Sequence, residues 1–150
     1  MSNVIKIASF NVRGLRNFRK RRQVFSYLHR RHFQIILLQE THSIISDERC
    51  WQNEWGGKIV FCHGNSNSRG VCFLFNPSFS HDVKDCYSDN FGRLLMIDLY
   101  IDESVYTLIN IYAPNVDDPC FSNLFGIILV VLGATISLLV GILTWFLILT

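Results

Sequence analysis

The stretch QIILLQETH, residues 34–42, decides how the rest of the sequence is interpreted. The four apolar residues from Ile35 to Leu38 form a short unbroken run that begins with β-branched side chains, which is typical of a strand buried on both faces of a sheet. Glu40 follows where this strand is expected to end. Because ligands bind at the carboxyl ends of strands in open α/β sheets, Glu40 is a candidate ligand-holding residue, whereas taken alone it would be a solvated turn residue.

The residues that precede this stretch predict a strand and a helix. Residues 4–10 alternate apolar with smaller or polar side chains and predict a strand that ends at Asn11. Residues 17–32 carry apolar side chains near helical spacing, with basic residues around them, and predict an amphipathic helix. A helix that joins two strands of one sheet makes them parallel, with a right-handed connection, so Asn11 and Glu40 are expected at the same edge.

The following residues predict strands that succeed one another directly. A short helical or turn segment is expected around Trp51 and Trp55, and strands are expected at residues 58–62, 70–75, 83–88, 93–101 and 105–112. This order indicates an α/β fold with mixed sheets. The last strand, like the first two, ends in polar residues, namely Asn110, Tyr112 and Asn115. Three strands therefore end in side chains suited to a phosphate or a hydrated cation.

Composition and charge describe a foldable chain with a basic start. The 150 residues are 49% hydrophobic and 13% aromatic, which suits one domain with a core. Residues 1–39 carry nine bases and no acid, whereas residues 40–150 carry five bases and twelve acids. The basic block suggests a polyanionic partner, although a solvated helix face is the commoner origin of such a run. Five cysteines without C-x-x-C spacing, and no signal peptide, favour reduced thiols in a nuclear or cytoplasmic protein.

The sequence contains four short motifs: Ser9–Leu15 (SFNVRGL), Leu38–Thr41 (LQET), Arg69–Val71 (RGV) and Asn110–Asn115 (NIYAPN). In this order they resemble the endonuclease/exonuclease/phosphatase superfamily, which includes exonuclease III, the apurinic/apyrimidinic endonucleases and DNase I. The resemblance extends over roughly residues 3–141 and is strongest to the nuclease domains that open the polyproteins of LINE-type retrotransposons. It implies the amino-terminal half of a four-layer α/β sandwich, with mixed β-sheets flanked by helices.

The resemblance implies Mg²⁺-dependent hydrolysis of DNA phosphodiesters, without a small-molecule cofactor. Glu40 and Asn11 would form the metal side of the site, since Mg²⁺ prefers oxygen ligands and few protein contacts. Tyr112 and Asn115 would be the catalytic residues that contact the scissile phosphate. His42 is not expected to be the general base, because relatives use a histidine much later in the chain. The expected DNA-binding residues are Arg13, Arg16, Arg19 and Arg69; relatives often carry an acid or amide at position 13.

Two motifs of the superfamily are absent from these 150 residues. An Asp-Phe-Asn motif would orient the nucleophile and contact phosphate, and a Ser-Asp-His motif would supply the acid and base. Without them the attacking water lacks an activating group. The sequence therefore predicts a truncated endonuclease-like domain with little or no activity of its own.

An apolar segment, residues 121–150, follows a partial domain expected at residues 1–120. The 26 residues from Leu124 to Leu149 carry no charge and exceed the roughly 20 needed to cross a bilayer, so they predict a transmembrane helix inserted in a membrane. The alternative function is a tail-anchored membrane protein whose remaining part binds nucleic acid or protein without catalysis. A third interpretation, a phosphorylated small molecule or lipid as substrate, is disfavoured by the basic helix and the motifs.

The same segment has a second interpretation as a remnant of the domain. Apolar residues from Phe121 to Leu132 keep helical spacing, and residues 136–141 suit the core strand that follows in relatives. A coding sequence for Asp-Phe-Asn-Leu-Val-Leu-Asp-Pro-His, read one nucleotide late, can encode Ile-Leu-Thr-Trp-Phe-Leu-Ile-Leu-Thr, which is residues 142–150. We therefore expect a frameshift near Gly141 as the origin of this apolar end.

Overall fold

The computed structural model describes residues 4–113, 137–141 and 144–149, and in the last two ranges it describes the backbone alone. Every strand expected before residue 113 is present, with bounds that differ by at most three residues, and a helix forms around Trp51 and Trp55. The elements are β1 (Ile7–Asn11), α1 (Phe18–Arg31), β2 (Ile35–Gln39), the 3₁₀ turn η1 (Ile45–Asp47), α2 (Glu48–Trp55), β3 (Ile59–Cys62), β4 (Val71–Phe75), β5 (Asp82–Ser88), β6 (Leu94–Ile101), β7 (Ser104–Ile111), β8 (Ser137–Gly141) and β9 (Thr144–Leu149).

Strands β1 and β2 are parallel neighbours, as expected for a β-α-β unit. Their register places Asn11 opposite Gln39 at the carboxyl end of both strands. Helix α1 connects them and begins where the Asn17 side chain accepts a hydrogen bond from the Lys20 N–H at 3.0 Å. This cap satisfies a donor that the first turn of a helix leaves unpaired. The first sheet edge is therefore built as the sequence predicted.

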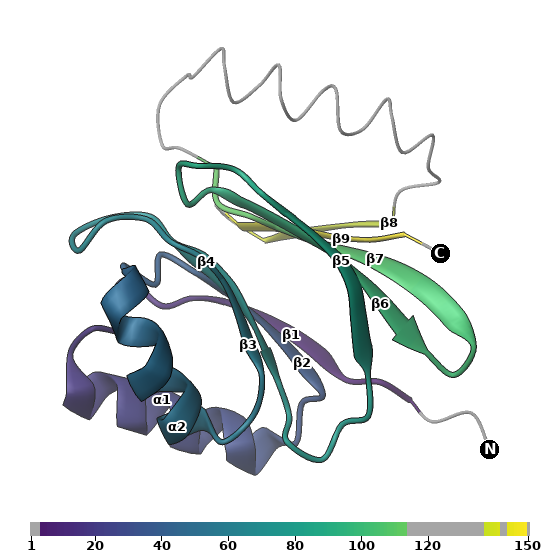
Figure 1. Cartoon of the computed structure of the whole chain (residues 1–150), viewed down its shortest axis with the longest axis horizontal. Helices are drawn as coiled ribbons and strands as arrows, with labels where there is room; N and C mark the ends of the chain where they lie inside the picture. The colour runs from purple at the N-terminus through teal and green to yellow at the C-terminus, as the bar shows by residue number, and fades with distance from the viewer. Residues whose placement is uncertain (1–3, 114–136, 142–143, 150) are drawn as a thin grey trace.

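The described strands form two sheets that pack face to face. One has the order β1-β2-β4-β3 with mixed directions, and the other has the order β5-β6-β7-β9-β8 and is antiparallel. Helices α1 and α2 cover the outer face of the first sheet, and the second sheet lies on its other side (Figure 1). This order of helices, sheet and sheet confirms an α/β sandwich.

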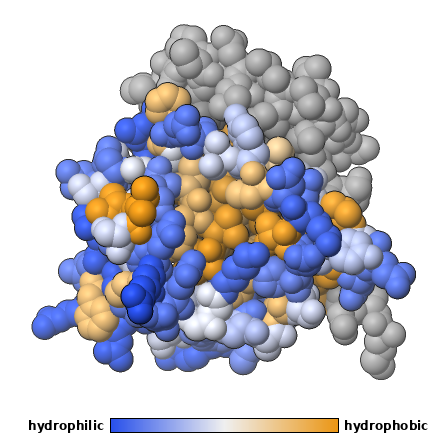
Figure 2. Space-filling model, in the orientation of Figure 1, coloured by the Kyte–Doolittle hydropathy of each residue, from blue (hydrophilic) through white to orange (hydrophobic). Residues whose placement is uncertain are grey.

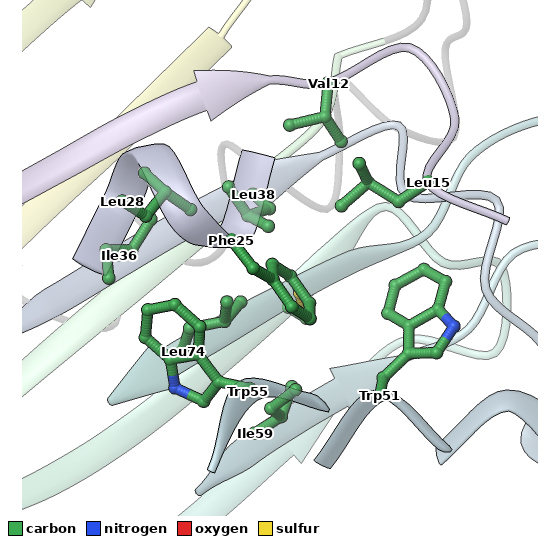
Figure 3. Packing of buried hydrophobic residues seen from close by; sticks show 11 residues of the cluster. Val12, Leu15, Phe25, Leu28, Ile36, Leu38, Trp51, Trp55, Ile59 and Leu74 are labelled. Atoms are coloured by element: carbon green, nitrogen blue, oxygen red, sulfur yellow. The ribbon is translucent and has the colours of Figure 1, made fainter. Parts of the chain in front are cut away.

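The apolar run of β2 contributes to two cores at once. Ile36 and Leu38 pack between the first sheet and the helices, among the side chains shown in Figure 3. Ile35 and Leu37 pack between the two sheets. All five residues of the strand are buried. A strand covered on both faces needs apolar residues at every position, which explains why this run shows no alternation.

One side of the sandwich exposes apolar atoms between its sheets. Figure 2 shows hydrophobic side chains gathered in the middle of this side, with hydrophilic residues around them. The strands nearest the viewer here are β3 and β5, which are the edge strands of the two sheets (Figure 1).

The end of the chain departs from the transmembrane helix expected over Leu124–Leu149. Residues 137–141 and 144–149 form β8 and β9, and β9 pairs with β7. A strand here supplies partners for backbone groups along β7, which a helix could not do. No helix in the described ranges is long and apolar enough to span a bilayer. Strand β8 agrees with the strand expected at residues 136–141, whereas residues 114–136, with the expected domain boundary, lie outside the described residues.

Candidate active site

A short backbone ladder joins the loops that follow β1 and β2. The N–H of Gly14 donates to the Glu40 carbonyl at 2.6 Å, and the N–H of Thr41 donates to the Gly70 carbonyl at 2.9 Å. The ladder extends the first sheet beyond its strands and connects three loops, namely those after β1 and β2 and the one before β4. We call this edge the rim; it contains Asn11–Gly14, Glu40–His42 and Arg69–Gly70. Asn11 and Glu40 meet at this rim, which confirms the prediction that they share a sheet edge.

The Asn11 side chain holds the Glu40 carboxylate directly. Asn11 Nδ2 donates to Glu40 Oε1 at 2.9 Å, while Asn11 Oδ1 accepts from the Arg13 N–H at 3.1 Å. Because a backbone N–H can only donate, the second bond fixes which end of the amide is the oxygen. The NH₂ group must then point at the carboxylate. Asn11 is therefore an orienting group for Glu40.

Tyr112 reaches the same carboxylate from the second sheet. It follows β7, and its N–H donates to the Arg93 carbonyl at 2.8 Å. Burial raises the pKa of the Tyr112 phenol above its usual value, and a hydrogen bond to Glu40 and the charge of Glu40 raise it further, against an opposing contribution from Arg93. The phenol thus stays protonated and remains a donor at neutral pH. Three strand ends therefore gather an amide, an acid and a phenol.

The rim contains several residues in the left-handed region of backbone space. The φ angles are 46° at Arg13, 53° at Glu40, 57° at His42 and 63° at Arg69. Residues other than glycine pay a conformational cost there, and such residues concentrate at functional sites where the surroundings hold them in place. The geometry of Glu40 is thus imposed by its neighbours, which is why local sequence propensity did not indicate it.

Gly70 allows two loops of the rim to touch. Its φ is 87°, and a Cβ at this position would lie 2.4 Å from Thr41 Oγ1. No real Cβ contact is that short, so a side chain here would push the loop that follows Glu40 out of place. The glycine of the Arg-Gly-Val motif is therefore required by the approach of Thr41.

Asn110 does not belong to the polar rim, contrary to the expectation that all the polar groups ending β7 face a phosphate. Its side chain is fully buried, donates to the Leu38 and Cys72 carbonyls at 3.1 and 2.9 Å, and accepts from Gln39 Nε2 at 2.7 Å. These bonds cross from the second sheet to the first. Asn110 consequently holds the two sheets together beneath the site. Asn115 lies outside the described residues.

The four arginines expected to bind DNA occupy different settings. Arg13 and Arg19 are exposed, and within the described ranges their guanidinium groups make no hydrogen bond or ion pair. Arg16 is exposed and pairs with Asp47 at 3.1 Å. Arg69 is half-buried on the loop beside Gly70. Among the four, Arg13 and Arg19 are therefore the two that are both exposed and without an ion pair to the residues that the structure describes.

His42 stands beside the carboxylate but is held neutral. Burial lowers its pKa below the usual value; the charge of Glu40 opposes this shift, and Lys20 adds to it. Lys20 itself is occupied, since its Nζ donates to the Val12 and Arg13 carbonyls at 2.6 and 2.9 Å. A neutral imidazole can donate or accept a hydrogen bond at the rim, but it adds no positive charge there.

Arg93 is a site residue that the sequence analysis missed. Its carbonyl anchors Tyr112, and its charge favours ionisation of the Tyr112 phenol. The sequence offered one signal for it, a Gly-Arg pair directly before a long apolar strand. Gly92 has a φ of 72° and forms the turn that places Arg93 directly before β6. A cation at the start of β6 is thereby placed beside the end of β7.

The donor set suits a metal held mainly through water and substrate. Within the described ranges no three His, Cys, Asp or Glu side chains gather in one place, so a closed metal site built from such ligands is not formed there. Mg²⁺ commonly keeps several waters and binds through one or two carboxylates together with phosphate oxygens. Glu40, oriented by Asn11, offers one such carboxylate.

Comparison with known proteins gives two matches. Residues 8–127 match the model of the Endonuclease/Exonuclease/phosphatase family. The chain is also 36% identical over 110 residues to the Transposon TX1 uncharacterized 149 kDa protein of Xenopus laevis. That alignment covers 73% of this chain and 8% of the Xenopus protein, so the chain spans a small part of its relative's length.

Proposed function

Because the chain belongs to the endonuclease/exonuclease/phosphatase family and is related to a transposon protein, we propose that it is part of a Mg²⁺-dependent DNA endonuclease of the retrotransposon type. The observation that carries this proposal is the convergence on Glu40 of Asn11, at 2.9 Å, and of Tyr112. The three side chains come from the ends of separate strands. The described order of helices, sheet and sheet supports our proposal that the chain forms the amino-terminal half of a four-layer sandwich.

Each residue of the cluster has a separate task in the proposed reaction. Glu40 would hold the cation, and Asn11, which donates to Glu40 Oε1, would orient the carboxylate. The family generally uses divalent metal ions, and such an ion would stabilise the charge that develops on the phosphoryl oxygens. In the DNA complex, the Tyr112 phenol would turn its single hydrogen from the Glu40 carboxylate to a phosphate oxygen, and its raised pKa supports its keeping that hydrogen. We also assign Asn115 to phosphate contact, from its place in the Tyr-Ala-Pro-Asn motif.

The basic residues near the rim would bind the DNA backbone. Arg13, Arg16 and Arg19 lie on the loop after β1 and the first turn of α1, and Arg69 lies on the neighbouring loop. We expect the substitutions Arg13→Ala and Arg19→Ala each to reduce the slope of log affinity against log salt by about one, as loss of one phosphate contact does. Lys84→Ala is the matched control, because Lys84 is ion-paired with Asp82 on β5.

The 150-residue chain should turn over slowly by itself. Neither the Asp-Phe-Asn motif nor the Ser-Asp-His motif occurs in it, so no residue is assigned to activate the attacking water. A frameshift near Gly141 accounts for the missing Asp-Phe-Asn motif. Sequencing of the locus tests this account, which fails if no alternative frame encodes Asp-Phe-Asn after Gly141.

Plasmid nicking with excess protein tests the function. We expect slow, Mg²⁺-dependent conversion of supercoiled to relaxed circles, reduced at least about tenfold by Glu40→Ala, the size of effect expected when a metal ligand or its support is lost. Glu103→Ala is the control, since Glu103 is an exposed acid in the turn between β6 and β7. Equal nicking by the wild type and Glu40→Ala would exclude Glu40 as a metal ligand.

A further inference from the structure

A line of hydrogen bonds leads from the rim to helix α2 and has no part in the chemistry proposed above. Thr41 Oγ1 and Ser43 Oγ are 3.1 Å apart, and Ser43 Oγ is 3.0 Å from His63 Nδ1. His63 Nε2 is in turn 2.9 Å from Glu48 Oε1. His63 follows β3, and Glu48 begins α2. The line thus connects the residue after Glu40 to the start of helix α2.

Burial excludes one obvious role for this line. A serine, a histidine and an acid in this order resemble a hydrolytic triad, but such a nucleophile must reach its substrate. The Ser43 side chain is fully buried, as is that of Thr41. Buried hydroxyl groups require hydrogen-bond partners, and the line provides them. Its role is therefore structural support of the neighbouring rim.

The supported segment is the one that needs restraint. Glu40 and His42, on either side of Thr41, both have left-handed backbone conformations. Two hydrogen bonds hold their backbone from the sides, from Gly14 to the Glu40 carbonyl and from His42 to the Arg69 carbonyl. The Thr41 side chain provides a third restraint, from within the protein. A strained conformation persists when its surroundings fix it in several directions.

We propose that His63 is a positioning residue for Glu40 and acts through Ser43 and Thr41. Glu48 accepts the hydrogen of His63 Nε2, which leaves Nδ1 to accept from the Ser43 hydroxyl. The Ser43 oxygen can then accept from the Thr41 hydroxyl, so every hydrogen in the line has a defined direction. This inference rests on the proposed role of Glu40 as the metal ligand.

The backbone near His63 is tied to the same rim. A Cβ at Gly92 would lie 2.5 Å from the His63 carbonyl oxygen, so these two loops are in close contact. The Gly92 carbonyl also accepts from the Gly70 N–H at 2.9 Å. A displacement of His63 would therefore reach Thr41 through its side chain and through this loop.

Mn²⁺ affinity, measured by the relaxation of water protons in the absence of DNA, tests the proposal without relying on nuclease activity. We expect Glu40→Ala to abolish binding at this site and His63→Ala to weaken it about tenfold, the range seen when a group that supports a metal ligand is removed. If Glu40→Ala leaves Mn²⁺ binding unchanged, both the proposed function and this inference fail. If Glu40→Ala abolishes binding and His63→Ala does not weaken it, the inference alone is overturned.

Two conservative substitutions separate positioning from simple packing. An asparagine amide can take the place of Nδ1 and keep the bond to Ser43, whereas a glutamine amide reaches as far as Nε2 and keeps the bond to Glu48 instead. We expect His63→Asn to restore most of the Mn²⁺ affinity and His63→Gln to resemble His63→Ala. The opposite order, or equal affinities, would contradict action through Ser43.

His81→Ala is the matched control. Both histidines stack on an aromatic ring: the ring centroids are 5.1 Å apart for His63 and Phe61 and 4.1 Å apart for His81 and Phe75. His81 Nδ1 lies 2.8 Å from the Phe79 carbonyl oxygen, and this residue sits at the opposite end of the sheets. Thermal unfolding of all variants is followed by circular dichroism. If His81→Ala lowers the unfolding midpoint as much as His63→Ala and lowers Mn²⁺ affinity equally, the effect is general destabilisation and the proposal is wrong.

Discussion

Tyr112 is the side chain whose proton affinity depends most directly on the geometry of the rim. Burial is the first cause of its raised pKa, and the Glu40 carboxylate is the second. A neighbouring negative charge disfavours the phenolate, so removing that charge must lower the pKa. The titration of one phenol therefore measures the proximity of the ends of β2 and β7.

We predict that Glu40→Gln lowers the Tyr112 pKa but leaves it above the usual value, because burial remains. The measurement is the pH titration of the ¹³Cζ resonance of Tyr112, assigned with Tyr112→Phe. Glu103→Gln, at a distant turn, serves as the control and should leave the titration unchanged. An unchanged Tyr112 pKa in Glu40→Gln would mean that the two groups are not in contact.

Gly70 and Gly56 form a natural pair for testing the close approach at the rim. Both have positive φ, 87° and 76°, but a Cβ at Gly56 would meet nothing within 4 Å, whereas one at Gly70 would lie 2.4 Å from Thr41 Oγ1. We predict that Gly56→Ala costs about 1 kcal/mol and Gly70→Ala clearly more, since a steric contribution adds to the same backbone cost. Urea unfolding measures both, and equal losses would argue against the Thr41 contact.

At the scale of elements, Arg21 fastens α1 to α2 and to the loop after β1. Its guanidinium makes two hydrogen bonds to Glu54, at 2.6 and 2.8 Å, and donates to the Leu15 and Arg16 carbonyls at 3.0 and 3.1 Å. The side chain is 5% exposed and its guanidinium lies over the Trp51 ring. The same pairing lowers the Glu54 pKa and raises that of Arg21. One base of the amino-terminal block is thus structural.

We predict that Arg21→Ala lowers the free energy of unfolding by about 3 kcal/mol, because it leaves Glu54 and two carbonyl groups without their partner. Arg22→Ala is the matched control: it removes an exposed arginine from the same turn of helix α1 and should cost less than about 0.5 kcal/mol. Chemical unfolding compares the two. Similar losses for both would show that the Arg21 contacts do not contribute to stability.

For the molecule as a whole, the three hydrogen bonds of Asn110 matter because they join the two sheets. Asn110→Ala would leave the Leu38 and Cys72 carbonyls and Gln39 Nε2 short of a partner in a buried place. We predict a loss of about 3 kcal/mol in the free energy of unfolding. Thr107→Val, which removes a 2.6 Å bond to Asp98 within one sheet, should cost about 1 kcal/mol and is the comparison.

The pairing of β9 with β7 predicts where the end of the chain belongs. Amide hydrogens of residues 144–149 should exchange slowly in buffer, because β9 lies between β7 and β8 in the second sheet. Hydrogen exchange with mass spectrometry, with and without phospholipid vesicles, provides the measurement. Rapid exchange in buffer that becomes slow only with vesicles would support the membrane interpretation instead.

The sequence by itself determined the elements and the shared sheet edge. The unbroken apolar run of β2 indicates a strand that is buried on both faces. The amphipathic pattern of α1 indicates a helix that is buried on one face, and a helix that joins two strands in this way predicts a parallel β-α-β unit. That unit places Asn11 beside Glu40 through register alone. These features depend on residues near one another in the chain, which is why periodicity reveals them.

Only the tertiary structure decided which polar groups serve the site and which serve the fold. Asn110 and Tyr112 are two residues apart, yet one bonds across the sheets in the core and the other reaches Glu40. The length of the uncharged apolar run suggested a membrane helix, whereas residues 144–149 form β9 and pair with β7. In each case the deciding partner is distant in sequence, and a hydrogen bond or a strand pairing across such a distance leaves no periodic signal in the chain.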